Sequence, residues 1–260
     1  MEVLYFNCEN GISGDMMLKA LMDLSDCGEQ IKAAMKEADF KSGFDDHHHD
    51  SEGHHGRSYE EVQRLIGASG FSLRAKEVAE NIYAYIADAE AKVHGATLET
   101  VHFHEVGRDE AIKNALGIGM AMEDIAPDLT VTSPICDGRG YILCSHGRIP
   151  VPVPAVKALM EKSSFEFRTA DIDTEMVTPS GLASLMGIGA EPDSNVKGLA
   201  DALEGIDETA PSVIIMKHTE ATGSRSTGRG GLKAYILKIA TDTTDVISTV
   251  ATEKIIDEVE

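Results

Sequence analysis

Apolar residues at the N-terminus follow first the spacing of a strand and then that of a helix. Residues 3–6 form a short uninterrupted apolar run, and after a glycine-containing turn Met16, Leu18, Leu21 and Met22 recur at roughly helical intervals. This pattern predicts a strand, a turn and a helix, in that order.

Helical spacing returns in several later segments. The longest runs from Ser72, a favourable N-cap residue, to Val93, and Gly95 follows as a typical helix stop. Residues 41–57 lack such spacing and are rich in Gly, Asp, Ser and His, which predicts a loop. The other expected helices are residues 30–38, 110–122 and 155–161, and one that begins at Thr178-Pro179-Ser180-Gly181.

Strands are expected mainly in the second half of the chain. Residues 129–135 and 141–144 flank the turn Asp137-Gly138-Arg139-Gly140, which predicts a hairpin. The three prolines of residues 149–154 exclude a helix or a central strand there. The acidic stretch 191–208 fits a loop or a marginal helix. Further strands are expected near Phe165 and at residues 213–216, 234–239 and 246–250.

Together these elements predict a mixed α/β (α+β) fold in two parts. Residues 1–190 would form a helix-rich α/β domain that contains the loop 41–57, and residues 191–260 would form a small separate α+β unit. A chain of 260 residues is long enough to bury a sizeable core.

Composition excludes several classes of partner. A formal net charge of −21, from 44 acidic and 23 basic residues, weighs against binding to nucleic acid or to an anionic membrane. No window reaches the roughly 18 apolar residues of a membrane span, and the N-terminus lacks a signal peptide. The cysteines form no CxxC pair, and Cys136 and Cys144 fit small buried side chains better than a facing pair. We therefore expect a cytoplasmic protein with reduced thiols.

Five of the ten histidines lie between Asp45 and His55, interleaved with carboxylates. Imidazole suits nickel, zinc and copper, and such a cluster can wrap an ion without a preformed cage. The alternative is a solvated polar loop that binds nothing. The candidate ligands are His47, His48, His49, His54 and His55.

A second pair of histidines lies in the sequence VHFHEVG at residues 101–107. In an extended chain His102 and His104 point to the same side, where they could hold a metal or a phosphate. Glu105 would point to the other side, as a partner of a ligand or as a proton acceptor. Two partly exposed histidines between helices fit these residues equally well.

The turn Gly11-Ile12-Ser13-Gly14-Asp15 joins the expected first strand to the first helix. Free N–H groups and the helix dipole favour an anion at such a place, so a phosphate could bind there. The turn is neither a P-loop nor a G-x-G-x-x-G sequence, and spacing alone favours a helix cap at Asp15. His146-Gly147-Arg148 and Thr178-Pro179-Ser180-Gly181 also present polar groups at the ends of elements.

Taken in order, these motifs resemble the LarC-type nickel-insertion family. The similarity extends from the N-terminus to about residue 188. The chain departs from the family pattern at Asn7-Cys8-Glu9-Asn10, at Arg108-Asp109-Glu110 and at residues 218–223. The matching segments are Gly11 to Met16, the His-rich insertion, Ala89 to Gly95, Val101 to Gly107, His146 to Pro152 and Val177 to Gly181.

This resemblance implies a cyclometallase (chelatase) of the lyase class. Such an enzyme inserts nickel into pyridinium-3,5-bisthiocarboxylic acid mononucleotide and forms the nickel-pincer nucleotide cofactor of lactate racemase-like enzymes. CTP, with Mg or Mn, is associated with the family's C-terminal region. Residues 191–260 would be a truncated start of that region, which a separate C-terminal subunit could complete.

The resemblance also implies positions for the site. His102, His104 and Glu105 would border the nickel or the cofactor, with Asp15 nearby, and the histidines of residues 47–55 would gather nickel. The alternative function is a nickel storage or delivery protein without catalysis. The residues expected to bind the nucleotide are Gly11, Ser13, Gly14, His146, Arg148, Thr178 and Ser180.

Overall fold

The computed structural model describes residues 1–38, 40, 56–144, 147–195, 199, 213–223 and 228–239. Most of the expected loop 41–57 and the expected strand 246–250 lie outside these residues. The helices are α1 (Gly14–Leu24), α2 (Gly28–Glu37), α3 (Tyr59–Ala68), α4 (Leu73–His94), α5 (Asp109–Ile125), α6 (Pro154–Lys162) and α7 (Pro179–Gly187), with a 3-10 turn at Asp193–Asn195.

Strands and helices are both well represented, which confirms the mixed α/β class. None of the helices in the described ranges is long and apolar enough to cross a membrane. The strands are β1 (Glu2–Asn7), β2 (Arg57–Ser58), β3 (His102–Phe103), β4 (Leu129–Thr132), β5 (Ile135–Asp137), β6 (Tyr141–Cys144), β7 (Gly147–Pro150), β8 (Phe167–Thr169), β9 (Glu191–Pro192), β10 (Val213–Ala221) and β11 (Leu232–Ile239).

Five strands form the main sheet, in the order β10-β11-β1-β4-β9. β1 is parallel to β4 and antiparallel to β11, which pairs with it along its whole length, from Glu2 opposite Lys238 to Asn7 opposite Lys233. The strands expected at residues 213–216 and 234–239 are therefore present, as parts of β10 and β11, in the same sheet as the N-terminal strand. The sequence predicts a strand at the position of β11, but it does not predict that this strand pairs with β1.

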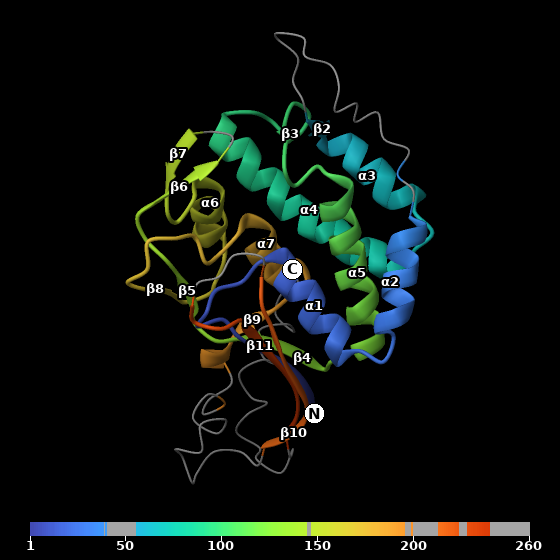
Figure 1. Cartoon of the computed structure of the whole chain (residues 1–260). Helices are drawn as coiled ribbons and strands as arrows, with labels where there is room; N and C mark the ends of the chain where they lie inside the picture. Colours follow the sequence, from blue (N-terminus) through green and yellow to red (C-terminus); the bar gives the residue numbers. More distant parts are fainter. Residues whose placement is uncertain are drawn as a thin grey trace, which may run out of the picture.

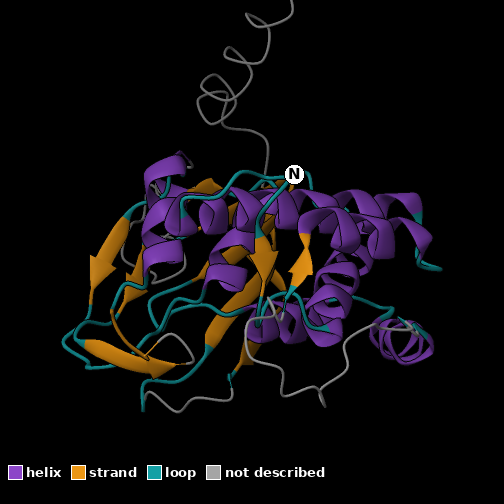
Figure 2. Cartoon of the chain, turned by 90° about the horizontal axis from the view of Figure 1, so that it is seen from above, coloured by secondary structure: helices purple, strands orange, loops and turns teal. Residues whose placement is uncertain are grey.

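Residues 3–6 of strand β1 are all apolar, as expected where both faces of a strand are buried. Leu4 and Phe6 belong to the larger apolar core, which they share with the helices, while Val3 and Tyr5 pack on the opposite face of the sheet against Leu237. Figure 1 shows the helices grouped over one side of this sheet. In Figure 2, the view from above, most of the helices lie along one side of the molecule and most of the strands along the other.

The long helix α4 confirms the sequence prediction at both ends. Ser72 caps it, its hydroxyl accepting from the N–H of Ala75, and Gly95 ends it in the left-handed conformation with φ 63°. Its apolar residues, among them Ile82 and Ile86, face the core. Helix α4 packs against α5, α6 and α7 and so positions one wall of the cleft described below.

Helix α3 was not expected from the apolar pattern, although its start carries a signal. Ser58 is the N-cap, and its hydroxyl accepts from the N–H of Glu61 three residues later. This Ser-x-x-Glu sequence is typical of a helix start, followed here by the apolar residues Val62, Leu65 and Ile66.

The expected hairpin between residues 129–135 and 141–144 is wrong. Strand β4 ends at Thr132 beside β1, and Pro134, which has no N–H to donate, separates it from β5. β5 then pairs in parallel with β8, and β6 forms its hairpin with β7, with Tyr141 opposite Pro150. Pro150 ends strand β7 of a two-stranded sheet, Pro152 lies in the connection that follows, and Pro154 begins α6.

Candidate functional site

A cleft of about 590 Å³ lies where the first turns of α1 and α7 meet the sides of α4 and α5. The connection between β10 and β11 borders it as well, so segments from both ends of the chain contribute to one cavity. The polar residues of its lining are Asn10, Ser13, Asp15, Tyr83, Glu110, Asn114, Glu175, Thr178, Ser180, Ser184 and Thr222.

Backbone hydrogen bonds hold the two helix starts together. The N–H of Ile12 donates to the carbonyl of Met176 at 2.9 Å, and the N–H of Thr178 donates to the carbonyl of Ile12 at 3.0 Å. Ile12 and Val177 thus form a parallel bridge between the two turns. Because each turn leads directly into a helix, the bridge brings the N-termini of α1 and α7 to the same side of the cleft.

Three glycines allow this close approach. A Cβ on Gly11 would lie 2.2 Å from the carbonyl oxygen of Met176, and Gly11 has the left-handed φ of +84°. A Cβ on Gly181 would lie 2.6 Å from the carbonyl oxygen of Ile12, and one on Gly14 would lie 2.9 Å from the hydroxyl of Ser180. The glycines of both motifs are therefore required by contact between the motifs, which neither sequence shows by itself.

Hydroxyl groups cap both helices. Ser13 accepts from the N–H of Met16 at 3.2 Å, and Thr178 accepts from the N–H of Gly181 at 3.1 Å. The cap of α1 is thus Ser13, so the expectation that Asp15 caps the helix is wrong. Asp15 instead accepts a 2.7 Å hydrogen bond from the side-chain amide of Asn114, which joins α1 to α5 across the cleft.

A buried carboxylate supports the segment that leads into α7. One oxygen of Asp137 accepts from the N–H groups of Gly138, Met176 and Val177 at 2.8 to 3.0 Å. Its other oxygen is buried and has no hydrogen-bond partner among the described residues. Burial raises the pKa of the Asp137 carboxyl, and the three N–H donors offset only part of this effect.

This raised pKa predicts a dependence of stability on pH. Because the folded protein holds the Asp137 proton more tightly than the unfolded chain, the stabilisation is complete below the unfolded pKa of about 3.9 and is lost as pH rises through the folded pKa. We expect the difference in the free energy of unfolding between the native protein and Asp137→Asn to fall as pH rises above about 4. Urea titrations at a series of pH values would measure it, and a difference that stays constant or grows with pH contradicts the assignment.

The cysteines near the site are poor metal ligands at neutral pH. Cys8 is fully buried, with its sulfur 3.3 Å from the hydroxyl of Thr132, and burial raises the pKa of its thiol to about 12. Burial also raises the pKa of the partly exposed Cys136. Metals bind the thiolate form, so each of these cysteines would first have to lose a proton that its raised pKa makes hard to remove at neutral pH. Among the described residues, no three side chains of His, Cys, Asp or Glu lie close enough together to hold a metal ion.

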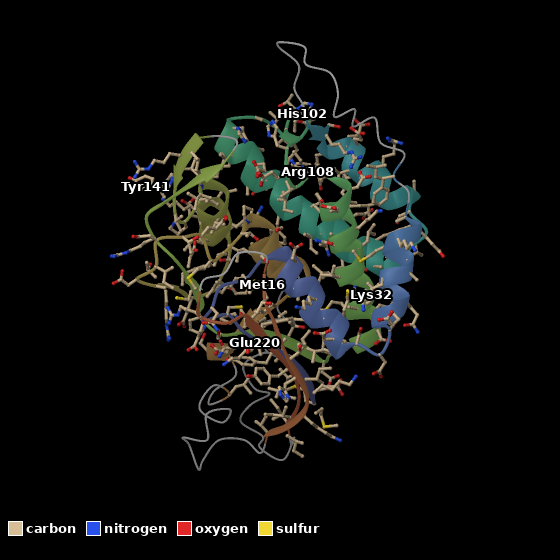
Figure 3. The ribbon with its side chains drawn as sticks, in the orientation of Figure 1. Met16, Lys32, His102, Arg108, Tyr141 and Glu220 are labelled. Atoms are coloured by element: carbon tan, nitrogen blue, oxygen red, sulfur yellow. The ribbon has the colours of Figure 1, made fainter. Side chains whose placement is uncertain are left out.

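The histidines of the sequence VHFHEVG do not line the cleft. His102 lies in β3, opposite Ser58 of β2, and its Nδ1 is 2.9 Å from the carbonyl oxygen of Thr100. His104 and Glu105 are exposed, and the ring of His104 lies 6.4 Å from that of His94. Figure 3 shows His102 at the edge of the molecule, well apart from Met16 in the cleft.

Of the remaining residues expected at the site, some line the cleft and others lie away from it. Gly14, Ser13, Thr178 and Ser180 line the cleft, and Gly11 supports it through its contact with Met176. The guanidinium of Arg148 lies over the ring of Tyr141, 4.2 Å from its centroid, away from the cleft. His146 and the histidines of residues 47–55 lie outside the described residues.

Sequence reasoning missed several residues of the cleft lining. Glu110 and Asn114 lie one turn apart on α5, and Glu175 directly precedes the segment that leads into α7. Glu110 falls in a segment that departs from the family pattern, and Glu175 lies beside the Val177–Gly181 motif. In the sequence, only the position of Glu175 next to this motif could have indicated that it belongs to the site.

The model of the family described as "Nickel insertion protein" matches residues 4–200. A pyridinium-3,5-bisthiocarboxylic acid mononucleotide nickel insertion protein from Acetivibrio thermocellus is 32% identical over 252 residues, which cover 88% of this chain and 58% of the relative. Proteins of the same description from Alkaliphilus metalliredigens and Akkermansia muciniphila are 29% and 32% identical, over 90% and 76% of this chain and 60% and 54% of their own lengths.

The chain thus spans little more than half the length of these three relatives. The comparison with solved structures found no match. The matched range, residues 4–200, contains the β1–α1 turn, α4, α5 and the start of α7, which form most of the cleft. The chain therefore belongs to the nickel insertion protein family, as its motifs had indicated.

Proposed function

We propose that this chain takes part in the insertion of nickel into pyridinium-3,5-bisthiocarboxylic acid mononucleotide and that the cleft binds this substrate. The observation that carries the proposal is the convergence of two family motifs, at residues 11–16 and 177–181, on one cavity. The reaction would produce the nickel-pincer nucleotide cofactor used by lactate racemase-like enzymes. It would use CTP with Mg or Mn, bound mainly by a C-terminal region or by a separate subunit.

The paired starts of α1 and α7 suit the phosphate of the mononucleotide. The first N–H groups of each helix, including those of Gly14, Asp15 and Ser180, have no acceptor within their own helix. They lie at the positive ends of the two helix dipoles, where an anion is favoured. Gly14 and Ser180 also line the cleft, so a phosphate there would leave the rest of the nucleotide in the cavity.

Nickel is a substrate in this proposal. The described residues form no preformed metal cage, and the two thiocarboxylate groups of the mononucleotide supply soft sulfur donors that suit nickel. The protein's task would therefore be to bring the ion to the bound nucleotide. The histidines 47, 48, 49, 54 and 55 are proposed to gather it.

Both described ends of the His-rich segment are anchored beside α5. Phe40 is buried, with the ammonium of Lys113 5.9 Å from the centre of its ring. Arg57, on the other side of the segment, is buried and paired with Asp109 at 2.6 Å. Strand β3 pairs with β2 here, so we propose that His102 and His104 belong with the nickel-gathering segment and not with the nucleotide site.

The cleft can be tested by filling it. Ala111 lies on α5, partly exposed, and lines the cavity, so a phenylalanine there would occupy the space of the ligand without entering the core. We expect Ala111→Phe to weaken the binding of nicotinamide mononucleotide at least tenfold by calorimetry. We also expect it to reduce nickel insertion in a mixture of the bisthiocarboxylated nucleotide, nickel, CTP and Mg, with a C-terminal subunit added.

The matched control is Ala84→Phe, at an exposed position on α4 that does not line the cleft. This variant should bind the nucleotide as the native chain does. Equal binding by both variants would show that the nucleotide does not occupy the cleft. Nickel binding without any nucleotide binding would favour storage or delivery of nickel over insertion.

A further inference from the structure

Negative charge is concentrated on the cleft. Asp15 and Glu110 are exposed at its border, and Glu175, only 7% exposed, lies in its wall. None of the described residues that line it is lysine, arginine or histidine. The helix starts provide for an anion at one end, so the carboxylates must match a different part of the ligand.

Two of the carboxylates, Asp15 of α1 and Glu110 of α5, border the cleft where these helices meet. The amide of Asn114 donates to Asp15 at 2.7 Å, and Glu110 precedes Asn114 by four residues, which places both on one face of the helix. Asp15, bound to Asn114, and Glu110, on the same face of α5 as Asn114, therefore line the same cleft. The cleft wall therefore carries two carboxylates, one from α1 and one from α5.

The neighbouring surface is apolar. Ile82, Tyr83 and Ile86 of α4 and Ile118 of α5 line the same cavity, and the hydroxyl of Tyr83 is occupied by a 2.6 Å bond to the carbonyl of Val106. Apolar side chains suit the face of an aromatic ring, and nearby carboxylates suit a positive charge on it. A neutral aromatic ring would gain only the first of these interactions.

We propose that Glu110 and Asp15 recognise the positive charge of the pyridinium ring and so determine specificity for a cationic ring. This inference rests on the proposed function, which places the nucleotide in the cleft. The carboxylates would lie beside the nitrogen end of the ring, next to the ribose that the nitrogen carries. The two thiocarboxylates, at the opposite end of the ring, then point away from them, which avoids repulsion between like charges.

The test compares two ligands that differ in the charge of the ring. Nicotinamide mononucleotide carries a pyridinium ring, and its reduced dihydropyridine form has the same ribose and phosphate but a neutral ring. We expect the native chain to bind the oxidised form about tenfold more tightly, a difference of about 1.4 kcal/mol. In Glu110→Gln the preference should fall to about threefold, and in Glu110→Gln with Asp15→Asn it should disappear.

The matched control is Glu60→Gln. Glu60 is the second residue of α3, as Glu110 is of α5. The two substitutions therefore remove the same charge from equivalent positions in a helix. Glu60 does not line the cleft, and its variant should keep the native preference. Equal binding of both ring forms by the native chain, or a preference that Glu110→Gln leaves unchanged, would overturn the inference while the nucleotide site stands. If neither form binds, the inference and the proposed nucleotide site are both overturned.

Discussion

Alanine at Gly11 is expected to lower the free energy of unfolding by about 3 kcal/mol and to abolish nucleotide binding in the cleft. The left-handed backbone of Gly11 costs an alanine about 1–2 kcal/mol. Its Cβ would also lie 2.2 Å from the carbonyl oxygen of Met176, and relief of such an overlap typically costs about 1–3 kcal/mol. The displaced atoms belong to the hydrogen bond between Ile12 and Met176 that joins the two helix starts.

Gly95→Ala is the matched control, because it separates the backbone effect from the contact. Gly95 also has a positive φ, of +63°, but nothing lies within 4 Å of the position of its Cβ. Its replacement should cost about 1 kcal/mol and leave nucleotide binding intact. Chemical denaturation and calorimetric titration of both variants would measure the difference. Equal losses in stability and unchanged binding in Gly11→Ala would show that the two motifs do not meet as described.

The second large effect is expected at Arg57, which supports the start of α5. Its guanidinium is almost fully buried, donates to the carbonyl of Gly107 at 2.9 Å and pairs with Asp109 at 2.6 Å. Arg108, the N-cap residue of α5, makes no capping hydrogen bond with its side chain, and Arg57 holds this helix start through Gly107 and Asp109. We expect Arg57→Met to lower the free energy of unfolding by about 3 kcal/mol.

This value lies at the low end for a broken buried pair, because Asp109 is 37% exposed and water can solvate it again. Lys32→Met breaks an ion pair with the same 2.6 Å distance to Glu29 on the surface, where the side chains are 61% and 85% exposed. That substitution should leave the free energy of unfolding nearly unchanged, because solvent screens an exposed pair. Urea unfolding of both variants compares them, and similar losses would contradict the idea that burial makes the Arg57 pair important.

Arg57→Met should also affect the site. Glu110 and Asn114 lie in the first two turns of α5, the helix whose start Arg57 holds. A shift at that start would move both side chains relative to Asp15. Nucleotide binding by Arg57→Met would therefore measure how far the positions of Glu110 and Asn114 in the cleft depend on Arg57.

Much of the local structure followed from the sequence. The apolar run of β1, the caps of α4 at Ser72 and Gly95 and the start of α7 at Thr178 depend on residues close together in the chain. Patterns of apolar spacing and capping residues report such local interactions directly. The family was also predicted, because short motifs in a fixed order are a property of the sequence, and the comparisons confirm it.

The prediction of a hairpin was wrong because the pairing of strands depends on contacts between residues far apart in the sequence. Residues 129–135 and 141–144 are both extended, but β4 lies beside β1 and β6 beside β7. A strand's own sequence says that it is extended and says little about which other strand completes its hydrogen bonds. The pairing of β11 with β1, from opposite ends of the described chain, could not be found in this way.

The same distinction applies to the site. The sequence alone determined which residue types could carry chemistry: the glycine-rich turn at residues 11–15, the helix start at Thr178 and the histidine pairs. Only the tertiary structure decided that the first two share a cleft while His102 and Arg148 lie outside its lining. The physical reason is that a site is made by packing, and the hydrogen bond between Asn114 and Asp15 joins α5 to α1 across 99 residues of chain.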